Sequence, residues 1–332
     1  MNMKIQQYII FFVVSILLSY IYKKILKDEN SRTSDYYYNM VNQYLLTNNS
    51  DFSHLGSNNK PYLWIHLHND NTIIPNVNQR SWLNFFSRNS KDLNIPYQYL
   101  TIKSIVSKCG NDFNICLIDD ESFKKILPGW SINLEYTANP IKTHLRLLAL
   151  SNLLNTYGGL LVPSSFICFK SLKPLYDKNI SYNKMFVGEF CNRTSGLSND
   201  LIASPELMGC SPNNNEMSEF IKHLEILNSK DFVAEMDFLG KSNKWLQEKC
   251  LNNEINLING SLLGTKNSNE KLVFIEELIS SSFIDLYDNA FGLYIPWNEL
   301  INRTKLEWFS RLSPEQVLES NTAIGKYLLI NS

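Results

Sequence analysis

Apolar residues recur along positions 61–175 in two alternating patterns, which predict strands and helices in turn. Short apolar runs bounded by polar residues are typical of buried strands and lie at 62–67, 113–118 and 160–162. Apolar positions at helical spacing predict helices over 97–108, 122–127 and 141–155. Gly158 follows the last of these helices and is a typical C-terminal stop. Strands that alternate with helices in this way indicate an α/β fold with a largely parallel sheet.

The second half of the chain is less regular. Apolar runs predict strands at 184–189 and 272–275. Helical spacing predicts helices at 215–227, 235–249, 299–309 and 314–320. The tail from Trp297 to Tyr327 interleaves basic and aromatic residues. It is either a surface for membrane or diphosphate, or an amphipathic helix that buries its aromatic side chains.

An uncharged stretch near the N-terminus predicts a membrane anchor. Residues 8–22 carry no charge, and Ile5 and Ile25 extend the apolar span just enough for a helix to cross a bilayer. Lys23 and Lys24 follow where a signal peptide would carry small residues, so we expect an uncleaved single-pass anchor. The excess of lysine after the span favours a cytoplasmic domain, whereas a domain in the lumen of the secretory pathway needs the opposite orientation, so the side of the membrane stays open.

These patterns divide the chain into an anchor at 1–27, a polar stem at 28–60 and a single domain at 61–332. A net charge of −1 over 332 residues argues against a nucleic-acid-binding surface. The six cysteines form no CxxC pair, and several lie in apolar runs that are typical of buried thiols; disulfide pairing is the alternative.

Polar residues gather where the first three predicted strands end. The stretch from His66 to Asp70 lies at the end of the first strand, Asp119 and Asp120 follow the second, and Pro163 to Ser165 follow the third. Ligands of open α/β sheets bind at the carboxyl ends of the strands. We therefore expect these side chains to line one crevice.

The segment from Lys142 to Ser165 resembles the core of a known group of enzymes. A helix carrying Arg146 leads into Tyr157-Gly158-Gly159, and a short strand then ends at Pro163-Ser164-Ser165. This layout is similar to DXD-containing glycosyltransferases of the capsular-polysaccharide-synthesis and initiating mannosyltransferase type. The resemblance implies a nucleotide-diphospho-sugar transferase fold, GT-A-like, with a Rossmann-like half.

The activity implied by this resemblance is hexosyl transfer from a nucleotide-sugar donor to a hydroxyl of a glycan, protein or lipid acceptor. The donor-binding residues that it implies are Trp64, His66, Asp119, Asp120, Arg146, Gly158, Gly159, Ser164 and Ser165. Met208 to Pro212 lies where such transferases place an acceptor-side loop, although a plain turn explains it equally.

The chain departs from the family at the metal site. The family holds Mn²⁺ or Mg²⁺ against the donor diphosphate with two acidic residues, and Pro163 and Ser165 stand in their places. No metal ligand is therefore assigned. Arg146 also lies about one helical turn farther from the glycines than the family pattern places it.

Three explanations of the missing acids stay open. The diphosphate is held without metal by Arg146, Lys142 and the serine hydroxyls; or Asp119 or Asp120 holds the metal; or the domain binds a ligand without turnover and is a pseudoenzyme.

Two carboxylates are candidates for the catalytic base. Glu189 ends the run predicted as a strand at 184–189, and Asp237 lies near the start of a predicted helix. An ordinary solvated or helix-capping carboxylate is the alternative for each. The pattern His66-x-His68-x-Asp70 places three potential metal ligands on one face of an extended strand, and a polar pocket lining is the alternative there.

Overall fold

The computed structural model describes residues 15, 17–21, 39–40, 43–44, 60–67, 97–192, 200–230 and 235–331. The chain divides into two compact units, Met1–Gln43 with Ile74–Phe85, and Tyr44–Ile73 with Phe86–Ser332. In the first unit, the described residues are helical. Every described strand belongs to the second unit, which contains the candidate site.

Most of the anchor predicted at 5–25, and most of the stem predicted at 28–60, lies outside the described residues. From the anchor, Ser15 and Leu17–Ile21 are described and are helical and exposed. Within the described part of the chain, no helix is at once long enough and apolar enough to cross a membrane.

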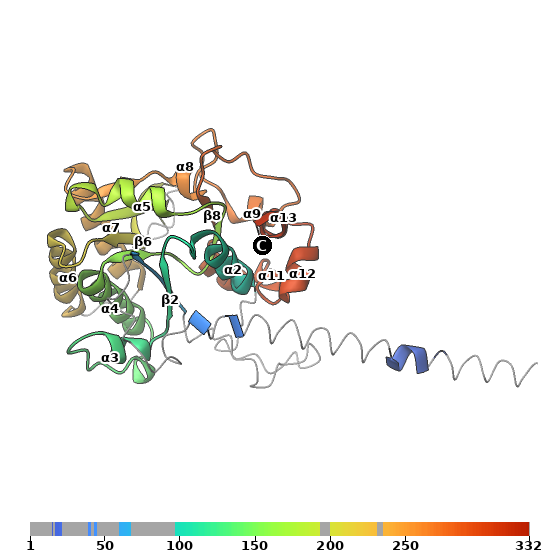
Figure 1. Cartoon of the computed structure of the whole chain (residues 1–332), viewed down its shortest axis with the longest axis horizontal. Helices are drawn as coiled ribbons and strands as arrows, with labels where there is room; N and C mark the ends of the chain where they lie inside the picture. Colours follow the sequence, from blue (N-terminus) through green and yellow to red (C-terminus); the bar gives the residue numbers. More distant parts are fainter. Residues whose placement is uncertain are drawn as a thin grey trace, which may run out of the picture. The chain divides into compact units, whose positions relative to one another are not determined.

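A six-stranded sheet forms the centre of the second unit (Figure 1). The strands, in their spatial order, are β2 (Asn114–Ile118), β1 (Tyr62–His66), β3 (Gly159–Leu161), β6 (Leu201–Cys210), β5 (Phe186–Cys191) and β7 (Asn256–Ile258). β1 is parallel to both β2 and β3, and β5 is parallel to β7. Only β6 runs against its two neighbours. The predicted α/β class with a largely parallel sheet is therefore confirmed.

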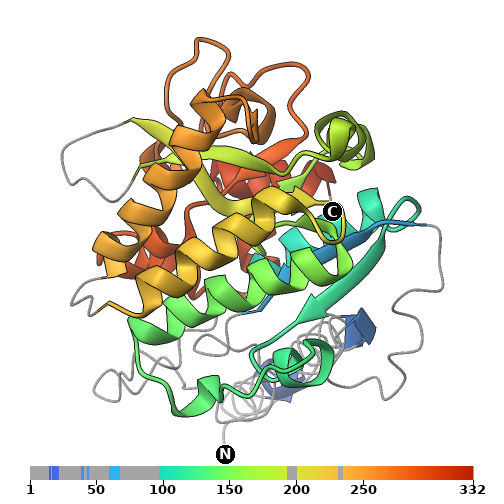
Figure 2. The same ribbon diagram turned by 90° about the vertical axis from the view of Figure 1, so that its left-hand side faces the viewer.

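Helices cover one face of this sheet and build a single apolar core with it. Figure 2 shows α4 (Ile141–Tyr157), α6 (Asn215–Asn228) and α7 (Glu235–Leu251) side by side across the face. Tyr62 and Trp64 of β1 point into this core, which also contains Phe123 of α3 (Ser122–Ile126).

The opposite face of the sheet is also covered. Leu63 and Ile65 alternate with Tyr62 and Trp64, so they point to that face, and they are fully buried. Because β1 is buried on both sides, its sequence is an almost continuous apolar run rather than an alternating one.

α2 (Tyr97–Cys109) contacts a second, two-stranded sheet of β4 (Phe166–Cys168) and β8 (Gly292–Tyr294). α12 (Pro314–Glu319) and α13 (Ala323–Asn331) contact α2 as well. The remaining elements are α5 (Lys173–Asn179), α8 (Gly260–Leu263), α9 (Ile275–Ile279), α10 (Trp297–Asn302), α11 (Glu307–Ser310) and the short 3-10 helices Leu134–Tyr136 and Ser181–Asn183.

The strands and helices predicted between residues 61 and 175 are all present, whereas the predictions for the second half of the chain contain three errors. The strand predicted at 272–275 is wrong, because only Leu272 forms a bridge, to Lys266. The Glu277 carboxylate instead accepts a hydrogen bond from the Phe274 N–H (2.8 Å), and this begins helix α9. The helix predicted at 299–309 is divided between α10 and α11, because the backbone is extended at Arg303.

The third error concerns the segment from Met208 to Pro212, interpreted as a loop or turn. Met208 to Cys210 instead pair with β3 inside the sheet as part of β6, and only the end of the segment, at Pro212, lies in a turn. Pro205 argues against a strand in the sequence, since proline cannot donate to a ladder. The pairing of β5 with β6 skips in register there, from Val187↔Met208 to Gly188↔Ser204, and this irregularity accommodates the proline.

The aromatic residues of the tail are divided between core and surface. Phe309 is fully buried, and it contacts the ring of Tyr97. Trp308 is 43% exposed. Of these two aromatic residues, the interpretation of an amphipathic helix that buries its aromatic side chains therefore holds for Phe309 and not for Trp308.

Candidate functional site

The carboxyl ends of three neighbouring parallel strands form the candidate site. His66 is the last residue of β1 and pairs with Ile118, the last residue of β2. Asp119 and Asp120 follow directly, and Pro163 lies two residues beyond Leu161, the last residue of β3. The crevice outside such strand ends is where α/β sheets bind ligands.

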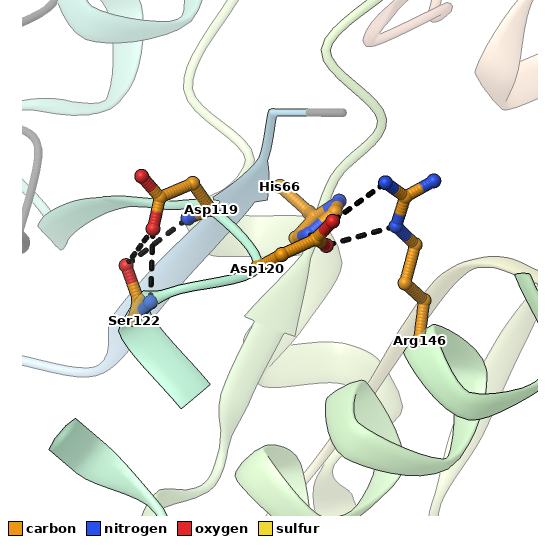
Figure 3. A network of polar contacts seen from close by, with 5 residues as sticks. All are labelled: His66, Asp119, Asp120, Ser122 and Arg146. Carbon is orange, nitrogen blue, oxygen red and sulfur yellow. Dashed lines mark hydrogen bonds and ion pairs between the residues drawn. The ribbon is translucent and has the colours of Figure 1, made fainter. Parts of the chain in front are cut away.

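A buried cluster of three charged or polar side chains lies at this edge (Figure 3). Arg146 reaches from α4 and donates two hydrogen bonds to Asp120, Nε to Oδ1 (2.8 Å) and Nη2 to Oδ2 (2.6 Å). His66 Nε2 lies 3.1 Å from Asp120 Oδ1. The exposed fractions are only 4% for Arg146, 5% for His66 and 6% for Asp120. The geometry is bidentate, which is the strongest arrangement for an arginine with a carboxylate.

The partners of Asp120 determine its charge state. Burial by itself raises the pKa of Asp120, but the hydrogen bonds and charges of His66 and Arg146 lower this pKa well below its usual range. Asp120 is therefore ionised at neutral pH and neutralises Arg146. The imidazole of His66 also stacks on Phe123, with ring centroids 5.4 Å apart, so the cluster is fixed by packing as well as by charge.

Asp119 and Asp120 are adjacent in the sequence but point in different directions (Figure 3). Asp119 Oδ1 accepts hydrogen bonds from the N–H (2.9 Å) and the hydroxyl (2.7 Å) of Ser122, at the start of α3. This contact satisfies one of the free N–H groups of the first helical turn. Glu121, the residue directly before the helix, makes no side-chain capping bond, so Asp119 supplies the contact at the helix start.

The Tyr-Gly-Gly turn has a structural explanation. Gly158 and Gly159 have positive φ values of 68° and 106°. A Cβ on Gly159 would collide with the Tyr62 carbonyl, and one on Gly158 would lie 2.6 Å from Cδ of Pro212. Trp64 is fully buried and donates its indole N–H to the Gly158 carbonyl (2.9 Å). The turn thus allows α4 and β3 to approach β1 closely.

Ser164 and Ser165 are held by α2 rather than open to solvent. The hydroxyl of Thr101 donates to the Ser164 carbonyl (2.5 Å), and the amide of Gln98 donates to the Ser165 hydroxyl (3.2 Å). The exposed fraction is 5% for Ser164 and 0% for Ser165. The Ser165 hydroxyl is therefore bound inside the fold, whereas the bond at Ser164 involves the backbone carbonyl and not the hydroxyl.

The two candidate bases lie in different surroundings. Glu189 Oε2 accepts from the Gly260 N–H (2.8 Å) and lies 2.8 Å from the ammonium group of Lys266. Through these contacts Glu189 connects β5 to the start of α8. Asp237 is exposed on the first turn of α7.

The residues that the structure describes do not fit the metal expected of the family. No group of three or more His, Cys, Asp or Glu among them could hold an ion. Both oxygens of Asp120 bind Arg146, and Oδ1 of Asp119 binds Ser122. Of the pattern His66-x-His68-x-Asp70, only His66 is described, and its Nε2 lies beside Asp120.

Sequence reasoning missed the polar face of α2. Gln98, Thr101 and Ser104 recur three residues apart on a helix that is otherwise largely apolar, and all three are buried. That spacing places them on one helix face, so a signal was present in the sequence. The partner of Glu189, Lys266, carries no comparable local signal, because it is distant in the sequence.

No protein-family model and no curated protein matches the chain. The solved structures similar to part of it include three glycosyltransferases. The galactosyltransferase LgtC in complex with donor and acceptor sugar analogues has 13% identity and a TM-score of 0.32, over 60% of this chain and 74% of LgtC. GlyE of Streptococcus pneumoniae TIGR4 has 12% identity and a TM-score of 0.33, over 61% of this chain and 46% of GlyE. The bifunctional glycosyltransferase WbbM has 12% identity and a TM-score of 0.38, over 67% of this chain and 43% of WbbM. Likenesses this partial establish neither the family nor the activity of the chain.

Proposed function

We propose that the chain is a glycosyltransferase-like protein on a nucleotide-diphospho-sugar transferase scaffold, which binds a nucleotide-sugar but does not catalyse metal-dependent transfer. The observation that carries this proposal is the identity and the burial of the residues that follow β3. Pro163 and Ser165 stand where the family has acidic residues, and Ser165 is fully buried under α2.

The chemistry of transfer explains why this observation matters. Negative charge accumulates on the leaving diphosphate, and a cation held there by carboxylates stabilises it as a Lewis acid and template. Proline and serine supply no charge with which to hold that cation. The guanidinium of Arg146 is not a ready substitute, because Asp120 already neutralises it. Binding without turnover is the function that this arrangement supports best.

The start of α4 supports the binding part of the proposal. Arg146 reaches the carboxyl edge of the strands from this helix, and Lys142 lies one turn earlier on the same face. The N-terminus of a helix and a nearby ammonium group both attract a diphosphate. Lys142 is therefore the cation that we assign to the donor phosphates.

We expect the full-length protein to bind a UDP- or GDP-sugar in calorimetry, with an affinity that manganese does not change. Lys142→Ala weakens binding about tenfold, because one charge-assisted contact to phosphate is lost. Lys222→Ala, an exposed lysine on α6, is the matched control and leaves the affinity unchanged. No free sugar or transfer product appears over the same period.

Two results would contradict this proposal. Manganese-enhanced binding with turnover would show an active transferase whose ligands lie elsewhere. Absence of binding to any nucleotide-sugar would leave only a scaffold for interactions.

We also propose that residues 5–25 anchor the protein in a membrane, supported by the absence of charge from residues 8–22. We expect the full chain to stay in the membrane pellet after alkaline carbonate extraction and a chain without residues 1–27 to be released. Release of both chains would refute the anchor.

A further inference from the structure

Two cysteines far apart in the sequence lie against each other inside the domain. Cys109 is the last residue of α2 and Cys168 is the last residue of β4. Their sulfur atoms are 3.8 Å apart, and both side chains are fully buried. This separation is close to van der Waals contact, so a disulfide bond needs an approach of about 1.8 Å.

Hydrogen bonds between α2 and the chain after β3 hold the two sulfur atoms in place. Gln98 binds Ser165, Thr101 binds Ser164, and the Ser104 hydroxyl accepts from the Cys168 N–H (2.9 Å). These contacts follow the helix from its first turn toward its last, where Cys109 meets Cys168. These contacts hold the elements that carry the two sulfur atoms beside each other before any bond forms, so only a small movement separates the thiols from a disulfide.

We propose that Cys109 and Cys168 are a redox-sensitive pair that closes into a disulfide and attaches α2 covalently to the segment 164–168. This inference does not depend on the proposed nucleotide-sugar binding. The oxidant is a small-molecule disulfide such as oxidised glutathione, or the thiol-oxidising machinery of an oxidising compartment.

With glutathione disulfide, the electrons and atoms balance in two exchanges. The Cys109 thiolate attacks one sulfur of glutathione disulfide, which forms a mixed disulfide and releases one glutathione thiolate. The Cys168 thiolate then attacks the Cys109 sulfur of the mixed disulfide and releases the second glutathione. The two thiol protons end on the two glutathione molecules, and the protein loses two hydrogens.

The surroundings of the two thiols favour Cys109 as the attacking group. The contact with Cys168 lowers the pKa of Cys109, and the same contact together with burial raises the pKa of Cys168. The thiolate is the nucleophile in such exchanges, so the first attack belongs to the group that ionises more easily. Because both thiols are buried, the rate is set by local opening of the end of α2.

The effect of the disulfide on the domain follows from its position. It closes a loop between residues 59 positions apart in the chain, and so restricts the unfolded state strongly. It also fixes the segment that contains Ser164 and Ser165. A Cys109–Cys168 disulfide found in cells would indicate that the domain lies in an oxidising compartment. The lysines beside the predicted anchor do not determine on which side of the membrane the domain lies.

The experiment is oxidation of the reduced full-length protein with glutathione disulfide, followed by alkylation, trypsin digestion and mass spectrometry. We expect a crosslink between the peptides 109–124 and 147–170. Peptide 109–124 also contains Cys116, so the map is repeated in the Cys116→Ala variant, which retains the crosslink. We further expect oxidation to raise the Tm by about 5–10 °C.

Cys109→Ala and Cys168→Ala each abolish both the crosslink and the rise in Tm, whereas Cys116→Ala keeps both. The peptide map of the unmodified protein decides the question even if a variant fails to fold. Recovery of both thiols fully alkylated after prolonged oxidation, or a crosslink to another cysteine, would overturn the proposal.

Discussion

Asp120→Ala lowers the free energy of unfolding by about 3–5 kcal/mol, measured by urea denaturation. The variant leaves the guanidinium of Arg146 buried without the carboxylate that receives two of its hydrogen bonds. An unneutralised buried charge costs far more than the pair itself contributes, and this explains the large expected effect.

The matched control is an exposed ion pair of similar composition. Lys173 and Asp177 lie one turn apart on α5 at 2.6 Å, with the side chain of Asp177 53% exposed. Asp177→Ala therefore changes the free energy of unfolding by less than about 1 kcal/mol. Equal effects of the two aspartate substitutions would show that the buried cluster does not stabilise the fold as described.

The pH dependence of the free energy of unfolding tests the role of Asp120 independently. The folded-state pKa of Asp120 is lowered, so its contribution to stability is present above the ordinary carboxyl pKa of about 3.9 and is lost as the pH falls below that value. Between about pH 5 and pH 2, stability falls less steeply in Asp120→Asn than in the unmodified protein. Parallel curves would contradict the ionised state assigned to Asp120.

Gly159→Ala lowers the free energy of unfolding by about 2–5 kcal/mol in the same denaturation experiment. Two physical costs add. The backbone has φ +106°, which residues with a Cβ rarely adopt, and the added methyl collides with the Tyr62 carbonyl of the neighbouring strand. Relief of that collision requires β1 and β3 to separate.

Gly129→Ala separates these two costs. Gly129 also has a positive φ of 77°, but an added Cβ there meets nothing within 4 Å. We expect a loss of only about 1 kcal/mol, from backbone strain alone. A loss at Gly159 no larger than that at Gly129 would show that the close approach to β1 is not a constraint on the sequence.

Each residue of the Tyr-Gly-Gly turn has a structural role in the fold. Tyr157 also has a structural contact, since its hydroxyl donates to the Ile126 carbonyl at the end of α3 (2.5 Å). All three residues of the turn are thus required by the packing of α3, α4, β1 and β3. The presence of these three residues is therefore explained by packing, and the turn alone is not evidence of catalysis.

The sequence predicted most of the helices and strands around the candidate site, because the burial of each of them is visible in its own apolar pattern. β1, β2 and α4 are long or strongly apolar, and their patterns reflect burial that each segment experiences on its own. β6 was missed because Pro205 interrupts its pattern, and the irregular pairing that tolerates proline involves a second strand. β4 and β8 are short strands whose pairing is non-local, so no local pattern indicates them.

The sequence alone determined that polar residues follow three consecutive buried strands, and that neither Pro163 nor Ser165 carries an acidic side chain. Only the tertiary structure decided which partners these residues have. It directs Asp120 to Arg146 and His66, Asp119 to Ser122, Ser165 to Gln98 and Glu189 to Lys266. Most of these partners are distant in the chain, and a hydrogen bond or an ion pair depends on distance and burial in space. For that reason, candidate site residues that read as available for a ligand in the sequence are engaged within the fold.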